Sequence, residues 1–233
     1  MGKYNLVFAN GCSFVQGSSL GGRDLPSEPV KDVRGRFSKL VADHFEADEV
    51  NLASGGAGND KIFRTTMEWI DQNEDLLQFV NVLFCFGVTY PQRSEIFMNK
   101  TQRYTKLNIY ADNSIAERIS KETQIMTNEE VIELAKLWLV ESYNEDERIK
   151  QHARLMKGMV AYIQKKAPSS DIFLFNSLGE YPEWFRKDLE LDPKFNPNWS
   201  MYIQDNQLQS KKTWHPQEPA HEDMANYIIE KYG

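Results

Sequence analysis

Three features of this sequence have residue types that could carry out nucleophilic chemistry: Ser13, the run from Gly55 to Gly58, and His215. Ser13 follows an apolar run and a glycine, so its hydroxyl would lie at the carboxyl edge of a sheet, near backbone N–H groups that can stabilise an anion. Histidine can take the proton of a serine hydroxyl near neutral pH. Each feature also has a structural interpretation, as a helix cap, a tight turn and a surface residue, respectively.

Other common kinds of site are not indicated. The glycine run is not a P-loop, because no Gly-Lys-Ser/Thr follows it, and it lacks the GxGxxG spacing of a dinucleotide site. Cys12 and Cys85 form no CxxC pair, and the four histidines show no zinc spacing. The remaining chemistry is that of a serine hydroxyl, a histidine and glycine-rich backbone.

Alternating strands and helices are predicted to position these residues. Apolar runs predict buried strands over residues 4–9, 49–53, 79–88 and 171–176. Helical spacing of apolar residues predicts helices near 37–45, from 59 onward, over 149–163 and over 220–232. The capping-box pattern of residues 127–130 predicts a further helix start. This alternation predicts an α/β fold with a parallel sheet of about five strands.

The ends of these strands hold the candidate chemistry. In a parallel α/β sheet the ligand lies beyond the carboxyl ends of the strands. Ser13, the run from Gly55 to Gly58, and the segment 87–89 each follow one of the predicted strands. We therefore expect them to meet at one edge of the sheet.

Size and charge restrict the class of protein. A chain of 233 residues fits a single domain over residues 1–233, with an insertion at about 96–128 and a long aromatic-rich loop at about 180–205. The insertion could form a lid or an oligomer contact, and the aromatic residues could stack on sugars or tether the loop to the core. The net charge of −7 argues against a nucleic-acid partner. The amino-terminal residues do not form a signal peptide and no apolar run could span a membrane, so a cytoplasmic location is expected.

Four segments together resemble a known family. Residues 8–14 (FANGCSF), 51–59, 86–89 and 215–221 are similar, in order and spacing, to the four blocks of SGNH (GDSL-type) hydrolases. The GCSF form of the first block resembles a subgroup often met in phage and bacterial genomes. The resemblance implies a three-layer α/β/α sandwich with a flavodoxin-like sheet, and hydrolysis of a small acyl ester, such as an acetyl ester on a carbohydrate.

The resemblance also implies roles for individual residues. Ser13 would be the nucleophile and His215 the general base, and the oxyanion would be held by the backbone N–H groups of Ser13 and Gly56 and by the side chain at Thr89. Neither a metal nor an organic cofactor is implied. Three further residues are expected to contact the substrate: Asn59, Arg93 and His221.

The sequence departs from the family pattern at three positions. Thr89 stands where the family has an asparagine, Lys212 where it has an acid, and Cys12 beside the nucleophile where it has an aspartate. Because lysine cannot accept the histidine N–H, His215 must be oriented by a backbone carbonyl, by another carboxylate such as Asp205 or Glu218, or by nothing.

Two other functions therefore stay open. One is a catalytically degenerate protein of the same fold that binds a small molecule or glycan in the same cleft. The other is a flavodoxin-like binder unrelated to esterases. Arg93 and Glu95 could contact a polar substrate or pair with each other, and pairing is the favoured interpretation.

Overall fold

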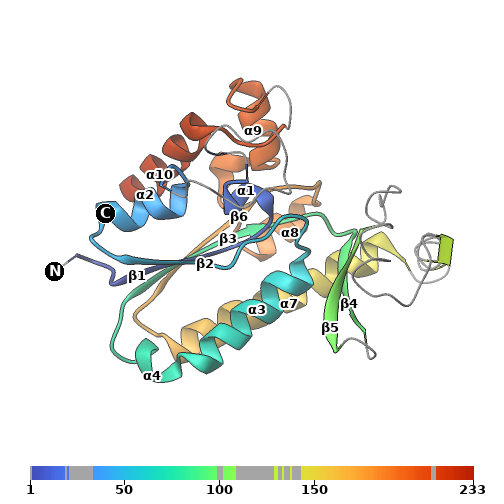
Figure 1. The fold of residues 1–233 in the computed structure, drawn as a ribbon, viewed down its shortest axis with the longest axis horizontal. Coiled ribbons are helices and arrows are strands. Elements are labelled where there is room, and N and C mark those ends of the chain that lie inside the picture. Colours follow the sequence, from blue (N-terminus) through green and yellow to red (C-terminus); the bar gives the residue numbers. More distant parts are fainter. Residues whose placement is uncertain are drawn as a thin grey trace.

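Four parallel strands form the central sheet of the protein, seen in a computed structural model (Figure 1). The structure describes residues 2–18, 20, 34–98, 102–108, 129–130, 133, 137, 143–210 and 214–233. The strands lie in the order β2-β1-β3-β6, with bounds β1 Leu6–Asn10, β2 Asp48–Asn51, β3 Val82–Val88 and β6 Asp171–Asn176. All four predicted strands are thus confirmed, in the order of the first four strands of flavodoxin.

The composition of the strands explains why they lie at the centre. Every residue of β1 and β3 is buried, and neither strand has a charged side chain. Such apolar runs are stable only where helices cover both faces of a parallel sheet. β2, at the edge of the sheet, is polar and only partly buried.

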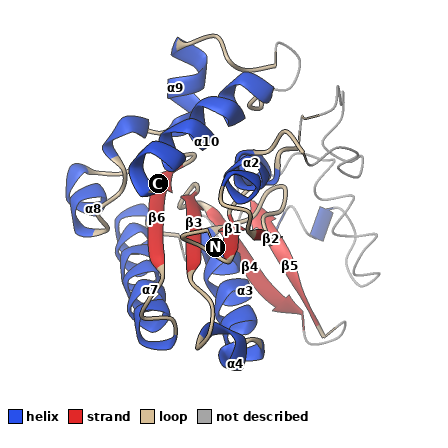
Figure 2. Cartoon of the chain, turned by 90° about the vertical axis from the view of Figure 1, so that its left-hand side faces the viewer, coloured by secondary structure: helices blue, strands red, loops and turns tan. Residues whose placement is uncertain are grey.

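Helices cover the two faces of the sheet (Figure 2). One face packs against α1 (Ser13–Gln16), α2 (Phe37–His44), α9 (Trp199–Asp205) and α10 (Glu218–Tyr232). The other packs against α3 (Asn59–Gln72), α4 (Glu74–Leu77), α7 (Glu145–Lys166) and α8 (Glu183–Asp188). The two apolar clusters use alternate residues of the same strands: Val7 and Leu83 face the first layer, and Phe8 and Phe84 the second. The expected three-layer sandwich is confirmed.

The sheet has four strands in the described part of the chain, one fewer than the approximate number predicted. After β6 the chain forms α8, the short 3₁₀ helix η2 (Pro193–Phe195), α9 and α10 rather than a further strand. The segment 180–205 is accordingly not one long loop. Four of its aromatic side chains are almost fully buried: Tyr181, Phe185, Phe195 and Trp199. These side chains attach the short helices to the core. Of the two roles considered for the aromatic residues, the structure therefore supports attachment to the core rather than stacking on sugars.

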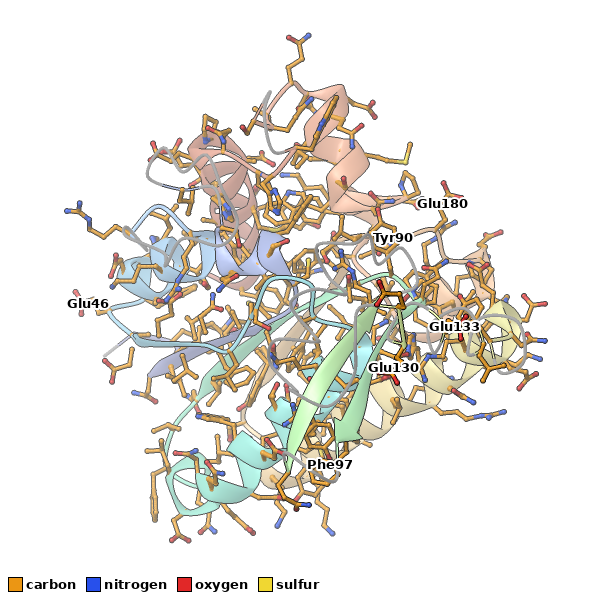
Figure 3. The ribbon with its side chains drawn as sticks, turned by 45° about the vertical axis from the view of Figure 1, so that its right-hand side comes forward. Glu46, Tyr90, Phe97, Glu130, Glu133 and Glu180 are labelled. Carbon is orange, nitrogen blue, oxygen red and sulfur yellow. The ribbon has the colours of Figure 1, made fainter. Side chains whose placement is uncertain are left out.

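A two-stranded antiparallel ribbon projects from the end of β3. It consists of β4 (Arg93–Met98) and β5 (Arg103–Asn108), so the predicted insertion begins within β4. Figure 3 labels Tyr90 just before the ribbon starts and Phe97 within β4. Arg64 of α3 attaches the ribbon, because its guanidinium pairs with Glu95 at 3.0 Å and lies 4.0 Å from the ring centre of Tyr104.

Two other expectations concern the segment after the ribbon. Residues 109–128 lie outside the described residues, and with them the first two residues of the predicted capping box at 127–130. The long helix α7 is capped by Asn144, whose side chain accepts a hydrogen bond from the Glu147 N–H at 3.1 Å. A search of the described helices finds none that is long and apolar enough to cross a membrane.

Candidate active site

The structure brings Ser13 and His215 together, although 202 positions separate them in the sequence. Ser13 Oγ lies 2.9 Å from His215 Nε2, a hydrogen-bond distance. Ser13 is the first residue of α1, and the N-cap position belongs to Cys12. The Ser13 hydroxyl is therefore not used as a helix cap, and its neighbour is an imidazole nitrogen that can take a proton.

The end of β1 directs Ser13 to this position. Asn10 closes the strand: its Oδ1 accepts from the Gly11 N–H at 2.9 Å, and its Nδ2 donates to Thr66 Oγ1 of α3 at 3.0 Å. α1 then packs closely on the strand ends, since a Cβ on Gly11 would lie 2.4 Å, and one on Gly87 2.7 Å, from Val15 Cγ2. Only glycine leaves room for this approach.

A short bridge after α9 holds His215. The Ser210 N–H donates to the His215 carbonyl at 2.9 Å, the Gln217 N–H donates to the Leu208 carbonyl at 3.0 Å, and Gln209 pairs with Pro216. The imidazole packs beside Phe14 of α1, with 5.3 Å between ring centres. His215 is thus held by the bridge after α9 and Ser13 by α1, and these two segments pack against each other.

The residues proposed to orient His215 have different locations. Lys212 lies outside the described residues. Asp205 ends α9 and Glu218 begins α10, and both side chains are exposed. Within the described part of the chain, neither carboxylate forms a hydrogen bond or ion pair with His215.

The glycine run forms a turn beside α1. The Ser54 N–H donates to the Gly11 carbonyl at 3.1 Å, and the Ala57 N–H closes a turn by donating to the Ser54 carbonyl at 3.0 Å. Gly56 is the third residue of this turn and has a φ of 70°, a conformation that favours glycine. It is exposed, so its backbone is accessible at the carboxyl edge of the sheet.

Thr89 occupies the end of β3 and has no exposed surface. Its Oγ1 accepts a hydrogen bond from Arg93 Nη1 at 2.9 Å. Its backbone carbonyl accepts from Asn59 Nδ2 at 3.0 Å and from the Tyr181 hydroxyl. A further link joins this strand end to α1, because Ser177 donates its N–H to the Val88 carbonyl at 2.9 Å and its Oγ lies 3.7 Å from Cys12 Sγ.

Two residues expected to contact substrate instead lie in the core. Asn59 is fully buried and its amide is engaged by Thr89, His152 and Tyr181. His221 is also fully buried, and its Nδ1 accepts from the Phe37 N–H at 3.2 Å. Burial lowers the pKa of His221 to about 3. The structure therefore corrects both expectations, because a side chain without exposed surface holds its neighbours rather than a substrate.

Arg93, the third of these residues, remains at the site. Its guanidinium contacts Thr89 and lies 5.1 Å from the ring centre of Tyr90. The expected pairing of Arg93 with Glu95 is not formed, because Glu95 pairs with Arg64. Arg93 and Glu95 are alternate residues of β4 and could share a face of the ribbon. Glu95 pairs with Arg64 of α3 instead.

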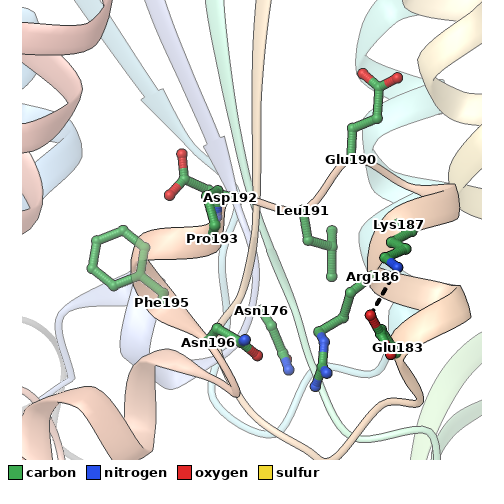
Figure 4. A pocket seen from close by; sticks show the side chains of 10 residues that line it. All are labelled: Asn176, Glu183, Arg186, Lys187, Glu190, Leu191, Asp192, Pro193, Phe195 and Asn196. Atoms are coloured by element: carbon green, nitrogen blue, oxygen red, sulfur yellow. Dashed lines mark ion pairs between the residues drawn. The ribbon is translucent and has the colours of Figure 1, made fainter.

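A cavity of about 340 Å³ lies elsewhere, between α8 and η2 (Figure 4). Its lining includes Asn176, Arg186 and Asp192, but neither Ser13 nor His215. Among the described residues no cluster of three or more His, Cys, Asp or Glu side chains could hold a metal ion. The cavity is thus separate from the Ser13–His215 pair.

Comparison with known proteins defines the fold. No family model matches the chain, and no curated protein matches it. A carbohydrate esterase structure, described as having divergent catalytic and non-catalytic binding functions, is similar over 99% of this chain and 68% of that chain, with 12% identity and a TM-score of 0.51. The acetyl xylan esterase Est2A from Butyrivibrio proteoclasticus is similar over 99% and 64%, with 11% identity and a TM-score of 0.50.

A protein from Parabacteroides merdae described as a GDSL-like lipase is similar over 99% of this chain and 96% of that chain, with 13% identity and a TM-score of 0.45. These three solved structures are described as two esterases and a GDSL-like lipase. At these identities the likeness concerns the fold, and the chain has the α/β/α sandwich of SGNH hydrolases.

Proposed function

We propose that the protein is a serine ester hydrolase with Ser13 as nucleophile and His215 as general base. The observation that carries this proposal is the 2.9 Å contact between Ser13 Oγ and His215 Nε2 at the carboxyl end of the sheet. Serine and histidine at hydrogen-bond distance are the minimum arrangement that activates a hydroxyl near neutral pH. The SGNH-hydrolase fold supports the same reaction class.

The reaction follows from this arrangement. His215 Nε2 takes the Ser13 proton as Oγ attacks the acyl carbon, and the carbonyl π electrons move to oxygen. The backbone N–H groups of Ser13 and Gly56 donate to that oxyanion. The tetrahedral intermediate then collapses, the alkoxide leaves with the proton from His215, and an acyl-serine remains. Water, deprotonated by His215, attacks this ester to form a second tetrahedral intermediate. As this intermediate collapses, Ser13 Oγ leaves and takes the proton back from His215, which releases the carboxylic acid and restores the free enzyme.

The substrate class is proposed from the site and from structural relatives. Two solved structures reported above, with TM-scores of 0.51 and 0.50, are described as a carbohydrate esterase and an acetyl xylan esterase. We therefore propose a small acyl ester, with an acetyl group on a carbohydrate as the first compound class to screen.

One specific observation favours a second candidate function. Thr89, at the position of the family's oxyanion asparagine, is fully buried, and Lys212 stands at the position of the family's acid. A protein weakened at both positions could bind a small molecule or glycan in the same cleft without turning it over.

A fluorophosphonate probe distinguishes these functions without knowledge of the substrate. Intact mass is recorded for the wild type and for Ser13→Ala and His215→Ala, with Ser169→Ala and His44→Ala as matched controls at exposed positions. The esterase proposal expects one adduct on the wild type and on both controls, and none on Ser13→Ala or His215→Ala. A folded wild type that forms no adduct would instead support the binding protein.

A further inference from the structure

We propose that Arg93 supplies the third oxyanion contact and that Thr89 positions its guanidinium. The proposal rests on the proposed esterase function and names a catalytic group that the family pattern does not provide. It begins from the state of Thr89, which has no exposed surface and whose hydroxyl already accepts a hydrogen bond from Arg93 Nη1 at 2.9 Å. A hydroxyl without exposed surface cannot reach a substrate oxygen, whereas Arg93 is partly exposed.

The backbone of Arg93 packs against the loop that follows β2. A Cβ on Gly58 would lie 2.6 Å from the Arg93 carbonyl oxygen and 3.1 Å from the Arg93 Cβ. Arg93 therefore packs against the loop that contains Gly56, and its side chain extends from there to Thr89.

Strand order makes this span significant. Gly58 follows β2, Thr89 follows β3, and β1 lies between these two strands with Ser13 beyond its end. Arg93 contacts the loops after β2 and β3, so its guanidinium lies at the same carboxyl edge of the sheet as Ser13. In this arrangement the carbonyl oxygen of a substrate bound to Ser13 would face that edge.

The charge of Arg93 is available for this task. In the described part of the chain no carboxylate lies within ion-pair distance of Arg93, although the nearby arginines are paired: Arg64 with Glu95 at 3.0 Å and Arg148 with Asp60 at 2.5 Å. The buried Nε of Arg93 has no hydrogen-bond partner there either. A guanidinium has five N–H donors, so several remain after the bond to Thr89.

The chemistry requires no proton transfer by Arg93. As Ser13 Oγ bonds to the acyl carbon, the carbonyl π electrons become a lone pair on oxygen, and the guanidinium donates an N–H to this oxyanion. When the intermediate collapses, the electrons re-form the C=O bond and the hydrogen stays on Arg93. Charge-assisted donors are roughly twice as strong as neutral ones, so one arginine could replace the missing asparagine.

The rate of fluorophosphonate labelling tests this role. In labelling, Ser13 Oγ bonds to phosphorus, fluoride leaves, His215 takes the proton, and the phosphonyl oxygen occupies the place of the oxyanion. We expect Arg93→Gln to slow labelling about a hundred- to a thousand-fold, the usual effect of losing an oxyanion donor. The exposed Arg154→Gln, which loses the same charge from α7, is expected to label at the wild-type rate.

Two further comparisons separate a chemical role from a structural one. Added guanidinium ion, below denaturing concentrations, is expected to restore part of the labelling of Arg93→Ala but not of Ser13→Ala. Thr89→Ser, which keeps the acceptor oxygen, is expected to label faster than Thr89→Val. Wild-type rates in Arg93→Gln, or an Arg93→Ala variant that guanidinium does not rescue, would overturn the role of Arg93 alone. A wild type that is not labelled would overturn the esterase proposal and this inference together.

Discussion

Asn59 holds the backbone of Thr89 from both sides. Its Oδ1 accepts from the Thr89 N–H at 2.9 Å, and its Nδ2 donates to the Thr89 carbonyl at 3.0 Å. The side chain thus satisfies both backbone groups of the residue just beyond β3, in the way a neighbouring strand would. Because Asn59 begins α3 and Thr89 follows β3, this pair fixes the end of the sheet relative to the helix beneath it.

A buried chain of polar groups supports Asn59. His152 Nδ1 lies 3.0 Å from Asn59 Nδ2, and His152 Nε2 lies 3.3 Å from Asp60 Oδ1. Burial lowers the pKa of His152, although the hydrogen bond to Asp60 opposes the shift. Burial acts to raise the pKa of Asp60, but His152 and Arg148 outweigh it and the pKa lies below its ordinary value. The imidazole is therefore neutral, and its Nε2 lies beside the ionised Asp60 carboxylate.

Removing the Asn59 amide should weaken both stability and the proposed site. Asn59→Ala leaves the buried Thr89 N–H and carbonyl with fewer partners, so we expect a loss of about 3 kcal/mol in the free energy of unfolding. We also expect slower fluorophosphonate labelling. Urea unfolding measures the first effect, with the exposed Asn206→Ala as control. Equal stabilities of the two variants would contradict the bidentate role.

The close packing of Val15 on Gly87 predicts that a larger residue at position 87 destabilises the protein. A Cβ on Gly87 would lie 2.7 Å from Val15 Cγ2 and 3.1 Å from the Phe175 ring, so Gly87→Ala should destabilise the protein by about 1–3 kcal/mol. It should also slow labelling, since it pushes α1 and Ser13 away from the strand ends. Gly158→Ala is the matched control: nothing lies within 4 Å of its Cβ in the exposed middle of α7. The free energy of unfolding of Gly158→Ala should rise by about 0.5–1 kcal/mol. Thermal unfolding of both variants measures these changes. A Gly87→Ala variant as stable as the wild type would contradict the prediction.

The buried His221 predicts loss of stability in acid. Its pKa is lowered by burial from 6.5 to about 3 in the folded protein, so the unfolded chain binds its proton first as the pH falls. Stability from this group is complete above the unfolded pKa and declines as the pH drops from there toward the folded pKa. Between pH 7 and pH 5 the expected loss is about 2 kcal/mol.

His221→Asn tests this cause. Asparagine keeps an acceptor for the Phe37 N–H but has no proton to bind, so the decline in unfolding free energy between pH 7 and pH 5 should be smaller by that amount. The exposed His44→Asn should leave the decline unchanged. A wild-type slope in His221→Asn would show that other groups cause the acid sensitivity.

The fourth prediction concerns whether Asp205 or Glu218 orients His215. Both are exposed, and in the described residues neither contacts His215. We expect Asp205→Asn and Glu218→Gln to label within about twofold of the wild type, whereas losing the acid of a functioning triad lowers rates about 10⁴-fold. A large loss in either variant would identify that carboxylate as the group that orients His215.

The sequence by itself determined the strands, the alternation of layers and the segments that meet at the site. β1 and β3 are recognisable because an uncharged run is stable only inside a parallel sheet. The pairing of Ser13 with His215 was expected only from the resemblance of four ordered blocks to SGNH hydrolases, and the structure places the two side chains 2.9 Å apart.

Only the tertiary structure decided which polar residues near those blocks face a substrate. Asn59 and His221 have types suited to binding, yet packing buries them among groups 30 and 184 positions away. Arg93 faces Thr89 rather than Glu95 because Arg64, on a separate helix, takes that carboxylate. Local sequence sets whether a segment is a helix or a strand, but the burial and partners of a side chain depend on distant segments that fold against it.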